Sequence, residues 1–290
     1  MNSAIAKGIA LRRYELVGRR EIRLSDDVPV PVPGPGEVLV RVAACTVCNR
    51  SDLVYYHYYG LREHCARGCF GHEISGTVAG TGPGVTRFAT GRRVFVRTPL
   101  TTGYAEYALA REVCVGALPD HVPFEQGAIL QLLPLAVHAT RGVRLGDRVA
   151  IVGQGPVGLM ALLAAAARGA SHLTVRLVRR HGLVVLLGTH HIDTRAGVDL
   201  VTWERKGLRV HSSAEPHDVA RAEAMAVAER LAADRTDRLH LDEPLTHVLP
   251  LAELPRAVRL LSASRSLHPD GERAPYAGPP PRVLKVAVRP

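Results

Sequence analysis

Long apolar runs are missing from this sequence of 290 residues. The longest one, residues 157–167, is far shorter than the roughly 20 residues that a helix needs to cross a bilayer. The first 16 residues also lack the charged start, the apolar core and the small-residue cleavage site of a secretory signal. We therefore expect an intracellular, cytoplasmic protein with no membrane partner.

Cysteine is scarce and odd in number, with five residues in the chain. Small secreted proteins that depend on disulfides have denser cysteines in even numbers. This composition argues against a disulfide scaffold. We interpret the cysteines as metal ligands or buried thiols, and Cys114 as a core residue.

Lysine is almost absent. Lys7, Lys206 and Lys285 are the only three, so 34 of the 37 cationic residues are arginines. The formal net charge of +10 raises the question of a nucleic-acid partner, but the arginines are spread along the chain and form no blocks. We interpret them as a solvated surface and expect no nucleic-acid partner. The 47% apolar and 22% charged residues are typical of a globular protein, with one large or two moderate domains.

The centre of the chain reads as a strand, a glycine turn and a helix. Residues 149–152 form an apolar run, Gly153, Gly155 and Gly158 follow in a G-x-G-x-x-G pattern, and an Ala/Leu helix stops at Gly169. This order is what a dinucleotide site needs, because the glycines allow a tight turn, a close approach to pyrophosphate and close packing of helix on strand. We therefore take the three glycines as candidate cofactor-binding residues.

The acidic half of that fingerprint is missing. A nicotinamide dinucleotide site needs an Asp or Glu about 20 residues further on to hold the ribose hydroxyls. No acidic residue occurs between Asp147 and Asp193. The sequence therefore makes binding of NAD or NADP doubtful.

The next strand is also too close to the one after it. Residues 172–178 read as a strand, and only residues 179–182 separate them from the apolar run 183–187. Parallel neighbours need a crossover of a dozen or more residues, so the two runs are not both parallel strands of one doubly wound sheet. Either residues 173–180 are the tail of a helix stopped by Gly182, which we favour, or the two runs form a hairpin. Both readings predict that one mononucleotide-binding half is missing.

The amino-terminal half is rich in short strands. Residues 37–44, 73–79, 93–97 and 105–110 alternate or run apolar between glycine-rich turns. This pattern is typical of a small all-β, barrel-like domain. The chain therefore places a β domain ahead of an α/β segment.

Metal-ligand types gather in two places of this β domain. One is Cys45-x2-Cys48, and the other is the stretch from Cys65 and Cys69 to His72 and Glu73. Thiolate, imidazole and carboxylate are the ligands of zinc, and a catalytic site uses three of them with an open position for water or substrate.

Several motifs in one order resemble the zinc-type medium-chain alcohol and polyol dehydrogenases. They are PGPGEVLVRV, CNxSDL, GHExSG, GPGVxxFxxGxRV, YAEY and GDRVAIVGQGPVGLMAL. The likeness runs almost continuously from residue 8 to about 170 and resumes at 182–188 and 244–261. It implies an α/β plus β fold, with a GroES-like β-barrel catalytic domain at 1–146, a truncated Rossmann-like domain at 147–239 and a return to the catalytic domain at 240–290.

The resemblance also implies a site. Cys48 and His72 match the family's zinc ligands, and Glu73 matches the adjacent glutamate, which is a ligand or exchanges with one. Ser51 matches the hydroxyl that begins the proton relay, and Asp52 the carboxylate that orients the histidine. We therefore expect zinc on Cys48, His72 and Glu73, with Ser51 and Glu73 as catalytic residues.

Some positions depart from the family pattern. Val54 stands where a relay histidine often follows, so we take His57, one helical turn later, as a catalytic stand-in. Leu133 stands where polyol-type relatives have a glutamate ligand, and Gln131 or a solvent molecule would fill that place. The four-cysteine lobe expected after residues 93–96 is absent.

Two other readings of the cysteines stay open. The four residues Cys45, Cys48, Cys65 and Cys69 come close to the spacing of a structural zinc site. Alternatively there is no metal, the latter two are loop thiols, and His72 is a core imidazole.

The expected function depends on the missing Asp or Glu that would hold the cofactor's ribose. Our first hypothesis is a zinc enzyme acting on a small hydroxylated or carbonyl substrate without net redox change, by elimination, isomerisation, cyclisation or hydrolysis. The alternative is an active NADP(H)-dependent oxidoreductase, with Arg176, Arg179 and Arg180 placed for a 2′-phosphate. The third is a non-catalytic, degenerate subunit. The resemblance implies a homodimer, an expectation that a shortened sheet weakens.

Overall fold

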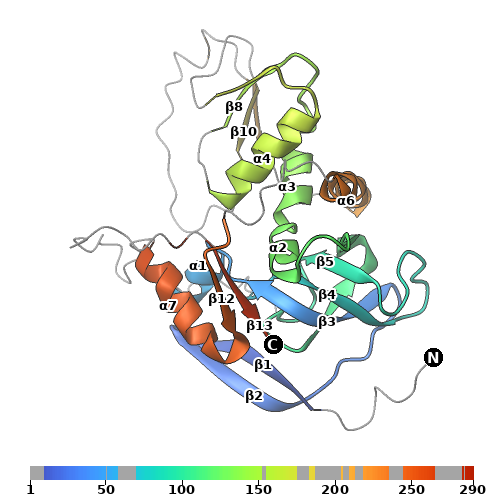
Figure 1. Cartoon of the computed structure of the whole chain (residues 1–290), viewed down its shortest axis with the longest axis vertical. Helices are drawn as coiled ribbons and strands as arrows, with labels where there is room; N and C mark the ends of the chain where they lie inside the picture. Colours follow the sequence, from blue (N-terminus) through green and yellow to red (C-terminus); the bar gives the residue numbers. More distant parts are fainter. Residues whose placement is uncertain are drawn as a thin grey trace. The chain divides into compact units, whose positions relative to one another are not determined.

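The computed structural model describes residues 10–49, 51–57, 70–151, 155–174, 183–186, 204, 209–212, 218–234, 244–264, 283 and 285–290. The chain forms two compact units (Figure 1). Unit 1 comprises Met1–Gln131 and His240–Pro290, and unit 2 comprises Leu132–Leu239. Within the described residues, every helix is too short or too polar to cross a membrane.

Unit 1 is built on a seven-stranded sheet. Six strands follow the order β12-β13-β3-β4-β5-β7, and β6 pairs with β3. Their pairings are antiparallel except for β12 with β13. The strands are β3 (Glu37–Thr46), β4 (Glu73–Thr81), β5 (Arg93–Arg97), β6 (Tyr107–Arg111), β7 (Val115–Ala117), β12 (His247–Pro250) and β13 (Val286–Arg289). The four strands predicted in the amino-terminal half are confirmed, whereas closure into a barrel stays a prediction.

Smaller elements complete unit 1. The hairpin of β1 (Ala10–Gly18) and β2 (Glu21–Pro29) pairs separately, and α7 packs against β13 and α1. The helices and 3-10 turns are α1 (Ser51–His57), η1 (Glu112–Cys114), α2 (Phe124–Ile129), η2 (Leu251–Glu253) and α7 (Leu254–Ser264). Cys114 is buried, as predicted.

Strand β3 organises the core of unit 1. Its residues Val38, Val40 and Val42 are buried on one face, as expected for an alternating strand. They join a cluster that includes side chains of β4, β5, α7 and β13. The same strand pairs with β4 and β6 and with β13 near the carboxyl end of the chain, so the segment that follows β3 begins beside strands that lie far apart in the sequence.

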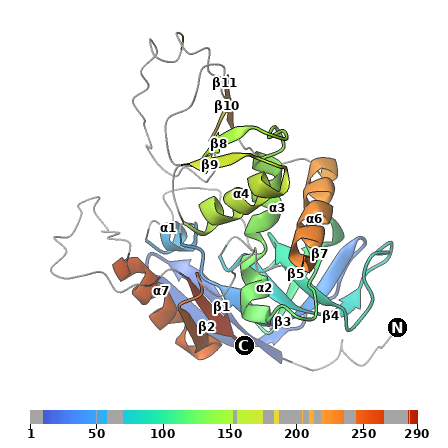
Figure 2. The same cartoon turned by 45° about the horizontal axis from the view of Figure 1, so that its top comes forward.

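In unit 2 a strand is followed by a helix and then by a second strand. Strand β8 (Arg148–Ala150) precedes α4 (Pro156–Ala167), and β9 (His172–Thr174) returns parallel to β8. Gly169, with φ of +82°, ends the helix in the left-handed conformation that favours glycine. Helices α4 and α6 (Asp218–Ala233) pack against α3 (Leu132–Ala139), as Figure 2 shows.

The favoured helical reading of residues 173–180 is wrong in its described part. Residues 172–174 form β9, because the chain has already left the helix at Gly169 and its backbone pairs with β8. Strand β10 (Leu183–Leu186) pairs in parallel with β11 (Arg209–Ser212), and the described parts of β9 and β10 do not pair with each other. Residues 175–182 lie outside the described residues.

Candidate functional site

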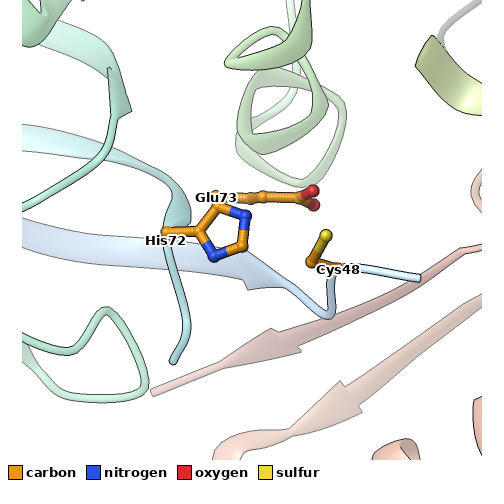
Figure 3. Close-up of side chains that lie close together, drawn as sticks. All are labelled: Cys48, His72 and Glu73. Atoms are coloured by element: carbon orange, nitrogen blue, oxygen red, sulfur yellow. The ribbon is translucent and has the colours of Figure 1, made fainter. Parts of the chain in front are cut away.

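Cys48, His72 and Glu73 lie together in unit 1. One ligand atom from each lies within 4.8 Å of the other two, and Figure 3 shows the Cys48 sulfur directed towards the other two side chains. The pairing of β3 with β4 explains the meeting, because Thr46 at the end of β3 lies opposite Glu73 at the start of β4. The residue just after one strand and those at the beginning of the next therefore reach the same edge.

Asp52 joins the two loops that carry this cluster. Its Oδ2 accepts a 2.8 Å hydrogen bond from the backbone N–H of Cys48, and its Oδ1 accepts one of 3.0 Å from Gly71. The Nδ1 atom of His72 lies 3.6 Å from Oδ1. Asp52 is fully buried, so a change in the position of its carboxylate would also change the position of the His72 ring. With Nδ1 facing Asp52, Nε2 is the atom that would bind a metal.

The charges of the cluster shift its acid–base equilibria. Burial disfavours the protonated imidazole, but the neighbouring Cys48 sulfur and Asp52 outweigh it and raise the pKa of His72 well above its usual value. Burial also opposes ionisation of Asp52, yet the hydrogen bonds that it accepts, first of all from His72, lower its pKa. Without a metal, the site therefore favours an imidazolium beside a carboxylate. A metal would displace that proton, since a ligating histidine must be neutral.

Glu73 is held by residues that the sequence pattern only partly indicated. Its Oε2 lies 2.5 Å from Lys285 Nζ and accepts a short hydrogen bond from Thr46, and its Oε1 accepts one of 3.2 Å from Gln131 Nε2. Gln131 was one of the two expected substitutes for the missing glutamate ligand. Lys285 was not predicted, although a lone lysine among the apolar residues just before β13 was a signal.

Ser51 begins α1 and lies beside the cluster. Its backbone N–H donates to the Cys48 sulfur at 3.4 Å, and the residue is buried. The backbone of Ser51 is therefore held against the Cys48 thiol, and the role of its hydroxyl as the start of a proton relay stays a prediction.

His57 is not brought to the cluster. It ends α1, and at about 1.5 Å of rise per residue its Cα lies roughly 9 Å along the helix from that of Ser51. Its Nδ1 accepts a 3.3 Å bond from Arg20 Nε, and its Nε2 lies 3.0 Å from Ser262 Oγ. His57, the expected substitute for the relay histidine, therefore has its partners on the turn between β1 and β2 and on α7.

Other predicted positions are placed only in part. Gly155 is the N-cap of α4 and Gly158 lies in its first turn, whereas Gly153 lies outside the described residues. The same holds for Arg176, Arg179, Arg180, Cys65 and Cys69, so the four-cysteine alternative stays untested. Cys45 is fully buried; burial first and the Asp52 carboxylate second raise the pKa of its thiol well above the usual value.

Comparison with known proteins gives this geometry a context. Residues 34–132 match the alcohol dehydrogenase GroES-like domain. The chain is 33% identical over 189 residues to sorbitol dehydrogenase of Bos taurus. The aligned segment covers 54% of this chain and 52% of that protein. Sorbitol dehydrogenase of Bacillus subtilis is 30% identical over 236 residues, or 65% of this chain and 66% of the relative.

A solved structure extends the likeness. A zinc-binding dehydrogenase from Sinorhizobium meliloti bound to NADP superposes with a TM-score of 0.72 at 19% identity, over 97% of this chain and 99% of that one. At this identity the superposition shows the fold alone. The chain belongs to the zinc-type medium-chain dehydrogenase/reductase superfamily.

The candidate metal cluster lies in the part of the chain that matches the family. Cys48, His72 and Glu73 all lie inside the segment that matches the GroES-like domain. The chain spans about half the length of the first curated medium-chain relatives that it matches.

Proposed function

We propose that this chain is a zinc-dependent oxidoreductase that transfers hydride between a small alcohol or polyol and NADP(H) or NAD(H). The observation that carries the proposal is the meeting of Cys48, His72 and Glu73 within 4.8 Å, in a chain similar to sorbitol dehydrogenases. These relatives are named as dehydrogenases, which favours the redox alternative over the reaction without net redox that we expected first. The NADP bound to a protein of the same fold also weakens the expected doubt about the nucleotide.

The residues present fit a zinc ion. Ligand atoms at about 2.0–2.3 Å around a tetrahedral zinc lie roughly 3.3–3.8 Å apart, so the observed separations of up to 4.8 Å need only small side-chain movements. A thiol and an imidazole are zinc's preferred donors. Cys48 and His72 would hold the ion, with Glu73 or the Oε1 atom of Gln131 as the further protein ligand and one position left for substrate.

Gln131 is the better substitute for the absent glutamate at Leu133. It is buried, and its Nε2 already donates to Glu73 Oε1, so the carboxylate holds the amide beside the cluster. Glu73 itself is engaged by Lys285 and Thr46. We propose that Glu73 orients Gln131 and exchanges with it as a ligand.

A bound zinc would act as a Lewis acid that lowers the pKa of an alcohol and polarises a carbonyl. Ser51, whose backbone is held against the Cys48 sulfur, would take up the proton of the alcohol through its hydroxyl and pass its own proton on to solvent. Asp52 would keep the His72 ring in place during the reaction. We assign His57 no role in this path, because its two ring nitrogens contact Arg20 and Ser262.

The nucleotide would bind to unit 2. The amino terminus of α4, with Gly155 at its N-cap, offers backbone N–H groups and a positive dipole to a pyrophosphate. We further propose that this domain is shortened. Strand β9 ends at Thr174 and β10 begins at Leu183, so only eight residues connect them, fewer than the dozen or so that a crossover between neighbouring parallel strands of a full nucleotide-binding sheet would need.

The test is a pair of titrations on the zinc-loaded chain. NADPH and NADH are titrated by calorimetry, and nicotinamide absorbance is followed with a panel of polyols, with Cys48→Ser as the control. Micromolar binding of one nucleotide and hydride transfer that Cys48→Ser abolishes are expected. Zinc binding without either nucleotide would return the chain to the reaction without net redox, and absence of zinc would leave a non-catalytic subunit.

A further inference from the structure

Tyr104 contacts the metal-site carboxylate from a distant segment. Its hydroxyl donates a 2.6 Å hydrogen bond to Oδ2 of Asp52, and both residues have no exposed surface. Tyr104 lies between β5 and β6, whereas Asp52 lies in α1. The bond therefore ties a third segment to the two loops that carry Cys48 and His72.

The Asp52 carboxylate depends on this hydroxyl. Its Oδ2 accepts from Tyr104 and from the Cys48 backbone, and its Oδ1 accepts from Gly71 and faces His72. A buried carboxylate that loses one donor has no solvent to replace it and shifts towards its remaining partners. Because two of those partners carry the candidate ligands, a shift of Asp52 moves the ligands as well.

The surroundings of Tyr104 fix its ring independently of the hydroxyl. The ring meets Phe70 edge to face, with centroids 4.8 Å apart. A Cβ atom added to Gly71, where φ is +75°, would lie 2.7 Å from the ring, so the ring rests directly on the backbone before His72. The backbone carbonyl of Tyr104 also accepts a 2.8 Å bond from Tyr14 N–H. Loss of the hydroxyl alone should therefore leave the ring in place.

We propose that Tyr104 is a positioning residue of the zinc site: its hydroxyl holds Asp52, and Asp52 holds the His72 ring and the Cys48 loop in the geometry that binds the metal. The proposal rests on the zinc site of the proposed function. It concerns a residue that touches neither metal nor substrate and acts through Asp52.

Tyr104→Phe tests the proposal by zinc affinity, which does not require catalysis. The dissociation constant is measured by competition with a chromogenic chelator, and folding is checked by circular dichroism. Loss of a residue that orients a ligand typically weakens metal binding by about 10–100-fold, and we expect that range with the fold retained. Tyr14→Phe is the matched control, because Tyr14 is also buried and its hydroxyl donates to the Ala252 carbonyl, away from Asp52.

A double-variant cycle shows whether Tyr104 acts through Asp52. Asp52→Asn should weaken zinc binding, and adding Tyr104→Phe to it should weaken binding by less than Tyr104→Phe does alone. Equal additive losses would overturn the proposal. So would unchanged affinity in Tyr104→Phe, or an equal loss in Tyr14→Phe.

Gly71→Ala keeps the test decisive if Tyr104→Phe does not fold. The added methyl group would push the Tyr104 ring and its hydroxyl away from Asp52 without removing them, and it would also strain the backbone at Gly71, where φ is +75°. Weaker zinc binding is expected, and unchanged affinity would contradict the proposal. A wild-type chain that binds no zinc at all would instead refute the proposed function, so the two failures are distinguishable.

Discussion

Lys285 and Glu73 form a buried ion pair in unit 1, with Nζ 2.5 Å from Oε2 and side chains 1% and 0% exposed. Lys285 immediately precedes β13, and Glu73 begins β4; β3 lies between these two strands. A buried charge is stable only when it is paired and hydrogen-bonded. The residue just before β13 therefore neutralises a carboxylate of the candidate zinc site.

Removing one member of this pair should destabilise the fold. Lys285→Met leaves Glu73 buried without its cation, which should lower the free energy of unfolding by about 3–5 kcal/mol. The double variant Lys285→Met/Glu73→Gln should recover much of the loss. Arg289→Met is the control on β13. The side chain of Arg289 is 58% exposed, so its ion pair with Glu125 should contribute less than about 1 kcal/mol. Denaturant unfolding followed by circular dichroism measures all three; equal losses at the two sites would contradict the prediction.

Zinc content should depend on Cys48 and His72. Cys48→Ser and His72→Ala each remove a ligand, so metal analysis of the purified chain should fall from about one zinc to well below one. Cys114→Ser is the control, since Cys114 is a buried residue of η1 and is not a member of the cluster. Full zinc occupancy in Cys48→Ser would rule out the assigned site.

Gly155→Asn should separate nucleotide binding from folding. The space beside Gly155 is open, its φ is −75°, and it caps α4 without a side-chain bond. Asparagine is at least as good an N-cap, so stability should hold while the side chain fills the space needed by the pyrophosphate. We expect nucleotide affinity to fall by about tenfold or more, equivalent to about 1.4 kcal/mol. Gly146→Asn, in another open turn of unit 2, should leave the calorimetric titration unchanged.

His57 should make unit 1 less stable in mild acid. Burial first and the nearby Arg20 second lower the pKa of His57 below its usual 6.5. The unfolded chain then binds the proton more readily, so the contribution of His57 is complete above about pH 6.5 and is lost as the pH falls through its folded value. Denaturant unfolding of wild type and His57→Gln from pH 8 down to about pH 5 should show a stability difference that shrinks with falling pH. A stability difference that stays constant with pH would show that protonation of His57 does not weaken its contacts with Arg20 and Ser262.

The sequence by itself determined the local parts of this protein. Alternating apolar residues predicted β3 and β4, and the family resemblance implied that Cys48, His72 and Glu73 form one site. The antiparallel register of the two strands explains why these residues meet. The glycine pattern likewise predicted the turn into α4.

Only the tertiary structure decided which distant residues complete the site. Tyr104 reaches Asp52, Lys285 reaches Glu73, and His57 is drawn to Ser262, 205 residues away. The helical reading of residues 173–180 failed in its described part for the same reason, since the pairing of β9 with β8 outweighed local preference. The residues next to a side chain in the sequence do not indicate its partner in the folded protein, because that partner depends on how whole strands and helices pack.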